Sequence, residues 1–342
     1  MKNNNPTLSI GLPVYNGAQF IEEALDSILA QTFEDFELII SDNASTDATK
    51  EICRDYAAKD SRIRYYRSEK NLGAAWNFNR VFELSSGKYF KWAAHDDVLA
   101  VDFLLKCVKV LEQNPNVVLC HSYTKIIDKD GQVLQHYQAK LNTNAPNPQE
   151  RFHALLGRHL NIQIFGLIRT SALKMRPLIG NYSYADEILL LKLAMLGRFY
   201  EIPEYLFSYR KHAQQSMSQF TDNLLIYASG NSKQPTDKLP DHHAYTIWFD
   251  PANEGQIFFP HWRIAQECLS SVWEAPLSWY ERICCYLSVF NQWRGLEFLL
   301  LKDSIEAVKQ LGYNSSKIFA LREQRSIGTE VETRIDKGLK EL

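Results

Sequence analysis

The sequence predicts an α/β fold with a mostly parallel, mixed sheet flanked by helices and a helical C-terminal extension. Over residues 8–93, short apolar segments alternate with segments whose apolar residues recur at helical spacing. Polar loops follow the apolar segments directly, as they do at the carboxyl edge of a parallel sheet. From Trp262 to Leu311 the pattern is instead helical and rich in aromatic side chains.

Each element of the N-terminal half has a local signature. The expected strands, apolar and bounded by turn-forming residues, are residues 8–16, 36–41, 62–67 and 89–93. The expected helices between them are residues 20–31, 48–59 and 74–85. The second strand is apolar on both faces, which is typical of a central parallel strand. A parallel, doubly wound sheet follows from this alternation.

The pattern changes after residue 115. We expect strands over residues 117–127, 163–169, 199–203 and 205–209, and helices over residues 152–160 and 184–196. Residues 128–131 indicate a hairpin turn, and residues 142–149 form a linker rich in proline and asparagine. Residues 213–260 are polar and irregular, so we expect a long loop or lid there, followed by a helical region over residues 261–342.

Composition excludes several classes of protein. The formal net charge of -2 over 342 residues gives no basic surface for nucleic acid. The six cysteines lack metal-ligand spacing and are typical of reduced thiols in a cytosolic protein. The first residues show no secretory signal, and the longest apolar region is too polar to span a bilayer. We therefore expect a cytoplasmic protein, with peripheral contact at the inner face of the membrane as an open alternative.

His95, Asp96 and Asp97 follow the fourth expected strand. Two adjacent carboxylates repel each other and are costly to bury without a cation, so a metal site is one interpretation. The other is a helix cap, because a helix is expected to follow. No Gly-x-Gly-x-x-Gly or Walker loop is present. A bound nucleotide would therefore need side chains and a cation in place of the usual phosphate-binding amides.

Six segments occur in the order seen in family 2 glycosyltransferases, which are inverting enzymes of the GT-A fold, and the chain resembles that family up to residue 212. The segments are Pro13–Asn16, Asp42–Asp47, Asn71–Gly73, His95–Asp97, Ala185–Glu187 and Tyr209–His212. Each is weak alone, but their order and their positions after expected strands are specific. The resemblance implies a GT-A domain over residues 1–212, with a nucleotide-binding half up to about residue 115 and an acceptor half over residues 116–212.

The resemblance implies a nucleotide-sugar donor, a UDP- or dTDP-sugar. The implied nucleotide-binding residues are Pro13, Tyr15, Asn16, Asp42, Asn71, Gly73 and Asp96. Asp42 would accept a hydrogen bond from a ring N–H of the base, and Tyr15 would pack on the base or ribose. Asp96 would meet the ribose or the sugar. Without the other segments, each of these could equally be a turn or cap residue.

The resemblance also implies a divalent metal, Mn²⁺ or Mg²⁺, held by Asp97 and His212 against the diphosphate. The family's first acid is Ala94 here, which weakens the case for three carboxylates sharing the metal. Asp186 matches the position of the general base, and Glu187 remains an alternative.

The implied reaction moves a sugar to a hydroxyl of a surface glycan, polysaccharide or lipid-linked acceptor. Two alternatives stay open: a catalytically silent module that binds sugar nucleotides, and a sugar nucleotidyltransferase. The second lacks the Gly-rich, basic N-terminal loop that a triphosphate requires. For the C-terminal aromatic residues we expect core packing. The alternative is a membrane-facing surface with Arg263, Arg282 and Arg294 near lipid phosphates.

Overall fold

The computed structural model describes residues 5–157, 159–174, 178–215 and 242–294, together with 297, 299–305, 307–309 and 311. Residues 216–241 of the expected long loop therefore lie outside the described residues. The same is true of Phe298 and of residues 312–342 of the expected C-terminal region.

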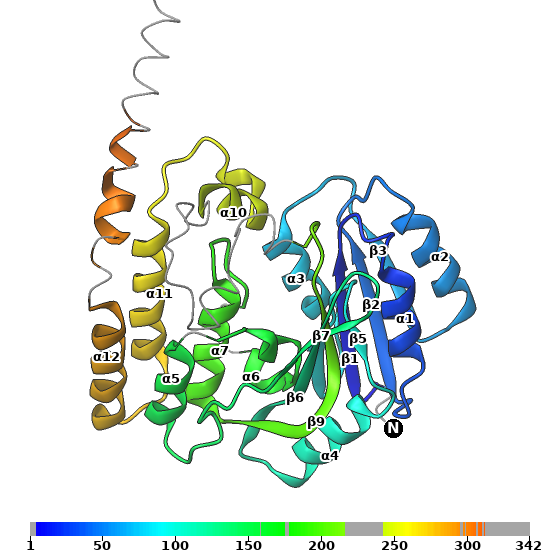
Figure 1. Cartoon of the computed structure of the whole chain (residues 1–342), viewed down its shortest axis with the longest axis horizontal. Coiled ribbons are helices and arrows are strands. Elements are labelled where there is room, and N and C mark those ends of the chain that lie inside the picture. Colours follow the sequence, from blue (N-terminus) through cyan, green and yellow to red (C-terminus); the bar gives the residue numbers. More distant parts are fainter. Residues whose placement is uncertain are drawn as a thin grey trace, which may run out of the picture.

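One sheet contains nine strands of the described chain (Figure 1). Their bounds are β1 Leu8–Val14, β2 Phe36–Asp42, β3 Ile63–Arg67, β4 Tyr89–Trp92, β5 Val98–Leu99, β6 Val117–Ile127, β7 Val133–Tyr137, β8 Leu167–Arg169 and β9 Arg198–Arg210. The order is β3-β2-β1-β4-β8-β6-β9-β5, and β7 pairs with β6. Neighbours among β3, β2, β1 and β4 are parallel, as are β6 and β9, whereas β8 runs antiparallel to β4 and β6. The predicted mixed, mostly parallel sheet is confirmed.

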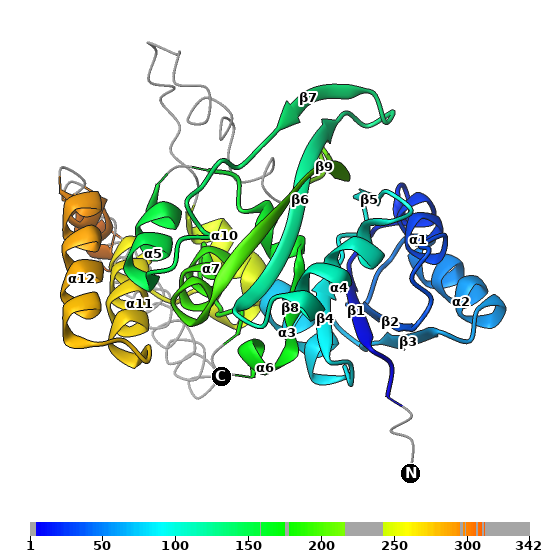
Figure 2. The same ribbon diagram turned by 90° about the horizontal axis from the view of Figure 1, so that it is seen from below.

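Helices cover both faces of the sheet. They are α1 Ile21–Leu29, α2 Thr49–Lys59, α3 Ala74–Glu83, α4 Phe103–Gln113, α5 Pro148–Leu156, α6 Thr170–Leu173, α7 Ala185–Leu196, α10 His242–Phe249, α11 Pro260–Glu274 and α12 Trp279–Trp293, with 3-10 turns η1 Ile162–Phe165 and η2 Pro251–Asn253. One apolar core joins the sheet to α1, α2 and α4. The other joins it to α3, α5 and α7 and continues into α10, α11 and α12. The C-terminal helices thus extend the second core, on the side away from β3 (Figure 2).

Strand β9 differs from the expected pair of short strands because it is continuous through Pro203. Its pairing with β6 shifts register between Ser122 and Tyr123, so that Ile202 and Tyr205 face adjacent residues of β6. Pro203 falls in this irregularity and is exposed. Proline has no N–H to donate, so a bulge tolerates it where a regular ladder would not.

The loops that follow three of the parallel strands lie at one edge of the sheet. Since β1, β2 and β4 are parallel, the loops that follow them emerge on the same side. Strand β5 pairs with β9, with Val98 opposite Ser208. This pairing brings the end of β9 beside residues 96 and 97.

Several C-terminal aromatic side chains do not pack in a core as the sequence predicts. Core packing is wrong for Trp273, Trp279, Tyr280 and Phe290, which are 64–72% exposed. Tyr286 and Trp293, in contrast, pack against the second core. In the described part of the chain, no helix has the length and apolar character needed to cross a membrane.

Candidate active site

Asp42 is the last residue of β2 and is fully buried. It lies at the edge of the sheet where the loops after β1, β2 and β4 emerge. Its Oδ1 accepts a hydrogen bond from the Ser45 N–H (2.8 Å), and its Oδ2 accepts from the Tyr65 hydroxyl (2.7 Å) and the Arg67 guanidinium (3.1 Å). Burial and the bond to Asp42 raise the pKa of Tyr65. Asp42 is thus where the sequence predicts a base-reading carboxylate, but three groups of the protein already use its oxygens.

Arg67 is a residue of this site that the sequence reasoning missed. Besides its ion pair with Asp42, its guanidinium donates a hydrogen bond to the Ser45 carbonyl (2.9 Å). A cation therefore stands beside the expected base-binding carboxylate. The only available signal was its place at the end of the third expected strand.

The loops after β1 and β2 are tied together. The Asn16 N–H donates to Ser45 Oγ (2.9 Å), and Asn16 Oδ1 accepts from the Thr46 N–H (2.8 Å). Asn16 and Ala44 both adopt left-handed backbone, with φ of 53° and 64°. Ala44 carries a Cβ, which this backbone region disfavours, so the loop keeps the conformation at some cost in strain.

Tyr15 and Pro13 have different accessibility. The Tyr15 side chain is 43% exposed at the edge of the sheet, so a ligand can reach it. Pro13 is buried within β1, opposite Ser41 of β2. Of these two predicted nucleotide-binding residues, Tyr15 is therefore the better placed to contact a nucleoside.

Asn71 and Gly73 form a turn beside the predicted nucleotide pocket. Asn71 Oδ1 accepts from the side chain of Asn43 and from the Gly73 N–H, both at 2.9 Å. Gly73 has φ of +87°, and a Cβ placed there would lie 2.4 Å from the Phe249 carbonyl oxygen. Glycine is required here because α10 ends directly against it. A segment expected as loop or lid is thus a helix packed beside the predicted nucleotide pocket.

The aspartate pair and His212 meet as the pairing of β5 with β9 dictates. His212 Nε2 lies 2.9 Å from Asp96 Oδ2, and the Arg210 N–H donates to Asp97 Oδ1 (2.9 Å). The side chains of Asp96, Asp97 and His212 are all buried. The His212 ring packs on Phe20, with the ring centroids 4.6 Å apart.

The two aspartates have opposite pKa shifts. Burial and the negative charge of Asp96 raise the pKa of Asp97 well above its usual range. Burial also acts to raise the pKa of Asp96, but the hydrogen bond from His212 outweighs it together with the other favourable contacts, and this pKa is lowered. Asp97 Oδ2 and His212 Nδ1 are buried and lack a hydrogen-bond partner among the described residues.

These residues fit a hard divalent cation. No cluster of three His, Cys, Asp or Glu side chains with metal-binding geometry occurs in the part of the chain that the structure describes. However, Mg²⁺ is commonly bound by one or two carboxylates together with substrate phosphates. Asp97 Oδ2 offers an unused acceptor. His212 bonds to a carboxylate through one nitrogen and leaves the other unpaired, as metal-binding histidines do.

Arg210 is a second residue that the sequence reasoning left without a role. Its side chain is 1% exposed, donates to the Asp96 carbonyl (2.8 Å) and pairs with Glu23 (2.5 Å). Its guanidinium also lies over the Phe20 ring, 5.0 Å from the centroid. Arg210 therefore holds Asp96 and Asp97 in place through its backbone and its side chain.

Asp186 and Glu187 lie in the first turn of α7, after Tyr184, whose φ is 64°. Burial raises the pKa of Asp186. Burial and the charge of Asp186 raise the pKa of Glu187 to about 7. After burial, the charges of Asp97, Asp96 and Asp186 all raise the pKa of Tyr209. Tyr209 is therefore within electrostatic range of both the aspartate pair and Asp186.

Comparisons with known proteins indicate the family of the chain. Residues 9–176 match the family model described as Glycosyl transferase family 2. A Haemophilus influenzae protein described as an uncharacterized glycosyltransferase is 30% identical over 226 residues, 64% of this chain and 69% of the relative. A Rickettsia bellii protein of the same description is 36% identical over 135 residues, but the match covers only 19% of its length.

Among solved structures, residues 1–349 of Staphylococcus aureus TarS, in a crystal structure with UDP-GlcNAc, superpose with a TM-score of 0.55 at 16% identity. The match covers 91% of this chain and 92% of that one. At this identity the likeness establishes the fold.

Proposed function

Because this chain belongs to glycosyl transferase family 2 and is a glycosyltransferase, we propose that it is an inverting, metal-assisted enzyme. It moves a sugar from a UDP- or dTDP-sugar to a hydroxyl of a surface glycan or lipid-linked acceptor. The observation that carries the proposal is the buried group of Asp96, Asp97 and His212 at the same edge of the sheet as Asp42, with Asp97 Oδ2 and His212 Nδ1 unpaired among the described residues. The catalytic unit comprises residues 1–212, and α10 completes its wall at Gly73.

The nucleoside lies between Tyr15 and the Asn71–Gly73 turn. Asp42 reads the base, with its carboxylate oriented by Arg67 and Tyr65. Among the described residues, Asp42 Oδ1 has a single donor, so it keeps one lone pair for a ring N–H. Asp96, fixed by His212, meets the ribose or the sugar.

Asp97 and His212 hold the divalent cation, Mn²⁺ or Mg²⁺, which when bound offsets the charge that develops on the leaving diphosphate. The unpaired atoms Asp97 Oδ2 and His212 Nδ1 support this assignment. The raised pKa of Asp97 supports it as well, because a buried carboxylate beside another one is stabilised by a cation.

Asp186 acts as the general base. It takes the proton of the acceptor hydroxyl as that oxygen bonds to the anomeric carbon on the face opposite the leaving group. The bond from the sugar to the diphosphate oxygen breaks in the same displacement, which inverts the anomeric configuration. The helix N-terminus next to Asp186 favours the carboxylate form, and burial opposes it.

A thermal-shift screen of UDP, dTDP, GDP and ADP, and of the triphosphates UTP and dTTP, with and without Mn²⁺ tests the donor proposal. We expect UDP or dTDP to raise the Tm more than ADP or GDP, and only with Mn²⁺ present. At a hundredfold excess over Kd, such binding adds about 2.7 kcal/mol to the free energy of unfolding. Stabilisation by none of the diphosphates would contradict the proposal. Preference for a triphosphate would favour a nucleotidyltransferase, and nucleotide binding without sugar transfer to any acceptor would favour the silent module.

The exposed aromatic surface of α11 and α12 supports a further part of the proposal, peripheral contact with the inner face of a membrane. Trp279, Tyr280 and Phe290 form this surface on α12. Arg282 is not available for lipid phosphates, because its guanidinium bonds to the carbonyls of Val272 and Ala275 and lies over Trp273 and Trp279. The contact is therefore mainly apolar.

Vesicle co-sedimentation measures this contact. We expect binding to both phosphatidylglycerol and phosphatidylcholine vesicles, and a loss of most of it in the double variant Trp279→Ser, Phe290→Ser. The double variant Val133→Ser, Leu134→Ser, on an exposed apolar site of β7, serves as the control. Equal sedimentation of wild type and the α12 variant would rule out this surface.

A further inference from the structure

A cavity of about 450 Å³ lies between the loop that precedes α7, the end of α10 and the start of α11. Its floor includes the buried residues Tyr182, Thr246 and Asn253. Its mouth includes Phe259 and Trp262, which are 44% and 49% exposed. None of the predicted site residues lines this cavity, so the donor site does not account for it.

The cavity is close to the general base along the chain and in space. Tyr182 precedes Asp186 by four residues, which limits the distance between their Cα atoms to about 14 Å. The hydroxyls of Ser183 and Thr246 lie 3.2 Å apart and join the cavity floor to the loop. After burial, the charge of Asp186 is the next cause that raises the pKa of Tyr245, the neighbour of Thr246 on α10.

The lining combines aromatic faces with amides and one guanidinium. Tyr182, Phe259 and Trp262 supply aromatic surface, and Asn181 and Gln266 supply amide groups. Sugar rings present apolar C–H faces and a rim of hydroxyls, so they match this combination. A few polar groups placed around an apolar wall are typical of a site that orients its ligand.

The guanidinium of Arg263 is partly engaged already. It lies over the Tyr182 ring, 5.3 Å from the centroid, and pairs with Glu267 at 2.8 Å. A diphosphate would need an uncompensated positive charge, whereas neutral hydroxyls need only hydrogen-bond donors and acceptors. The charge of the lining therefore favours a neutral glycan over a second nucleotide.

We propose that this cavity binds the part of the acceptor glycan that does not react, one or more sugar units away from the hydroxyl that attacks. The inference rests on the proposed glycosyl transfer and names the acceptor as an oligosaccharide chain. Binding remote sugars positions the reacting hydroxyl near Asp186, since binding energy from non-reacting parts of a substrate supports orientation at the reacting centre.

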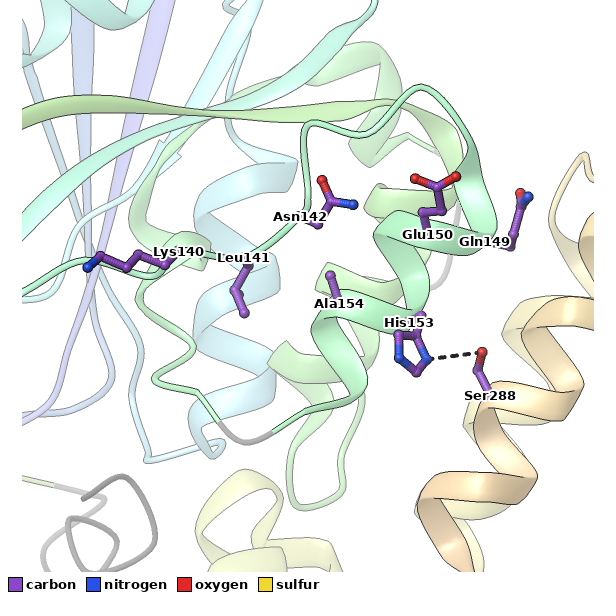
Figure 3. A pocket seen from close by; sticks show the side chains of 8 residues that line it. All are labelled: Lys140, Leu141, Asn142, Gln149, Glu150, His153, Ala154 and Ser288. Carbon is purple, nitrogen blue, oxygen red and sulfur yellow. Dashed lines mark hydrogen bonds between the residues drawn. The ribbon is translucent and has the colours of Figure 1, made fainter. Parts of the chain in front are cut away.

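A second cavity, also of about 450 Å³, provides a contrast (Figure 3). Its lining includes Lys140, Gln149, His153 and Ser288, and no aromatic ring other than the His153 imidazole contributes to it. It lies on α5, which packs toward the C-terminal end of α7, where Arg151 donates to the Ala194 carbonyl (2.7 Å). It is thus at the opposite end of α7 from Asp186.

A glycan array of bacterial-type oligosaccharides, probed with the full chain, tests the proposal. We expect wild type to bind a set of oligosaccharides, and Phe259→Ala and Trp262→Ala each to weaken that binding by about tenfold or more. Trp262→Phe should retain binding, because it keeps an aromatic face and loses only the bond from Trp262 Nε1 to the Leu300 carbonyl. Trp273→Ala is the matched control, an exposed tryptophan of the same helix outside the cavity.

UDP binding with Mn²⁺ is measured on the same preparations. Wild type that binds UDP but no oligosaccharide would overturn the cavity proposal and leave the donor site standing. Equal glycan binding by wild type and Trp262→Ala, or equal loss in Trp273→Ala, would also overturn it. If wild type bound neither UDP nor dTDP in the presence of Mn²⁺, the proposed glycosyl transfer itself would be contradicted.

Discussion

Replacing Asp97 with asparagine is expected to abolish sugar transfer and Mn²⁺-dependent UDP binding together. The amide keeps an oxygen for the Arg210 N–H but removes the negative charge that would hold the cation. Metal stabilisation of a leaving group is worth several kcal/mol, so transfer should fall by roughly 10³-fold or more. Transfer assays and isothermal titration of UDP with Mn²⁺ measure both effects.

The same variant should not unfold the protein. Burial and Asp96 raise the pKa of Asp97, so this group costs folding free energy from the ordinary pKa of an aspartate upward, and the cost is complete above the raised pKa. An uncharged side chain removes this cost. We therefore expect the Tm of Asp97→Asn without metal to equal or exceed that of wild type near neutral pH.

Asp130→Asn, in the exposed turn after β6, is the control for a loss of one carboxylate elsewhere. Two outcomes would contradict the metal assignment. One is retention of Mn²⁺-dependent UDP binding by Asp97→Asn. The other is a fall in its Tm that accounts for the lost activity.

Replacing Asp186 with asparagine should lower kcat by roughly 10²- to 10⁴-fold, the usual range for a lost general base. UDP binding with Mn²⁺ should stay close to wild type, because Asp186 does not belong to the diphosphate site. Glu187→Gln is the matched comparison, one position along the same helical turn. It should retain most of the transfer activity.

The pH profile separates these two carboxylates. A base must be deprotonated to act, so kcat should rise with pH through the pKa of the base and level off above it. Burial raises the pKa of Asp186, which moves this limb above the range of an ordinary aspartate. Glu187 has its pKa raised to about 7, partly by the charge of Asp186, so Glu187 is still protonated while Asp186 ionises. Glu187→Gln should therefore leave the limb close to its position in wild type.

An acid limb at about pH 7 that disappears together with activity in Glu187→Gln would give the base role to Glu187. Full activity of Asp186→Asn would have the same consequence. Both measurements use saturating donor, so that a change in nucleotide binding does not enter kcat.

Much of the fold could be predicted because its signals are local. Apolar spacing distinguished the first strands and helices, and polar residues after each strand predicted that Asp42 and Asp97 belong to one edge. The parallel pairing of β1 with β2 and β4 realises that prediction. The prediction of core packing for the C-terminal aromatic residues failed for a physical reason. The exposed faces of Trp279 and Phe290 follow the same helical period as a core face would, and periodicity alone cannot tell them apart.

Arg67 and Arg210 were missed for a different reason. Each is an unremarkable basic residue at a strand end until its partner is known. Arg210 meets Asp96 across 114 positions of sequence, and Arg67 meets Asp42 across 25. Although Arg210 lies in the segment Tyr209–His212, the sequence near either arginine does not show which group its guanidinium meets.

The sequence by itself determined the order of strands and helices and the residue types at their ends, because each depends on neighbours within a few positions. Only the tertiary structure decided which groups meet. It pairs His212 with Asp96 and leaves Asp97 Oδ2 and His212 Nδ1 unpaired, and it sets α10 against Gly73. It also opens the cavity beside Tyr182. Such pairings depend on sheet register and on helix packing between segments that are distant in sequence. Local sequence patterns do not specify either of them, because both depend on how the whole chain packs.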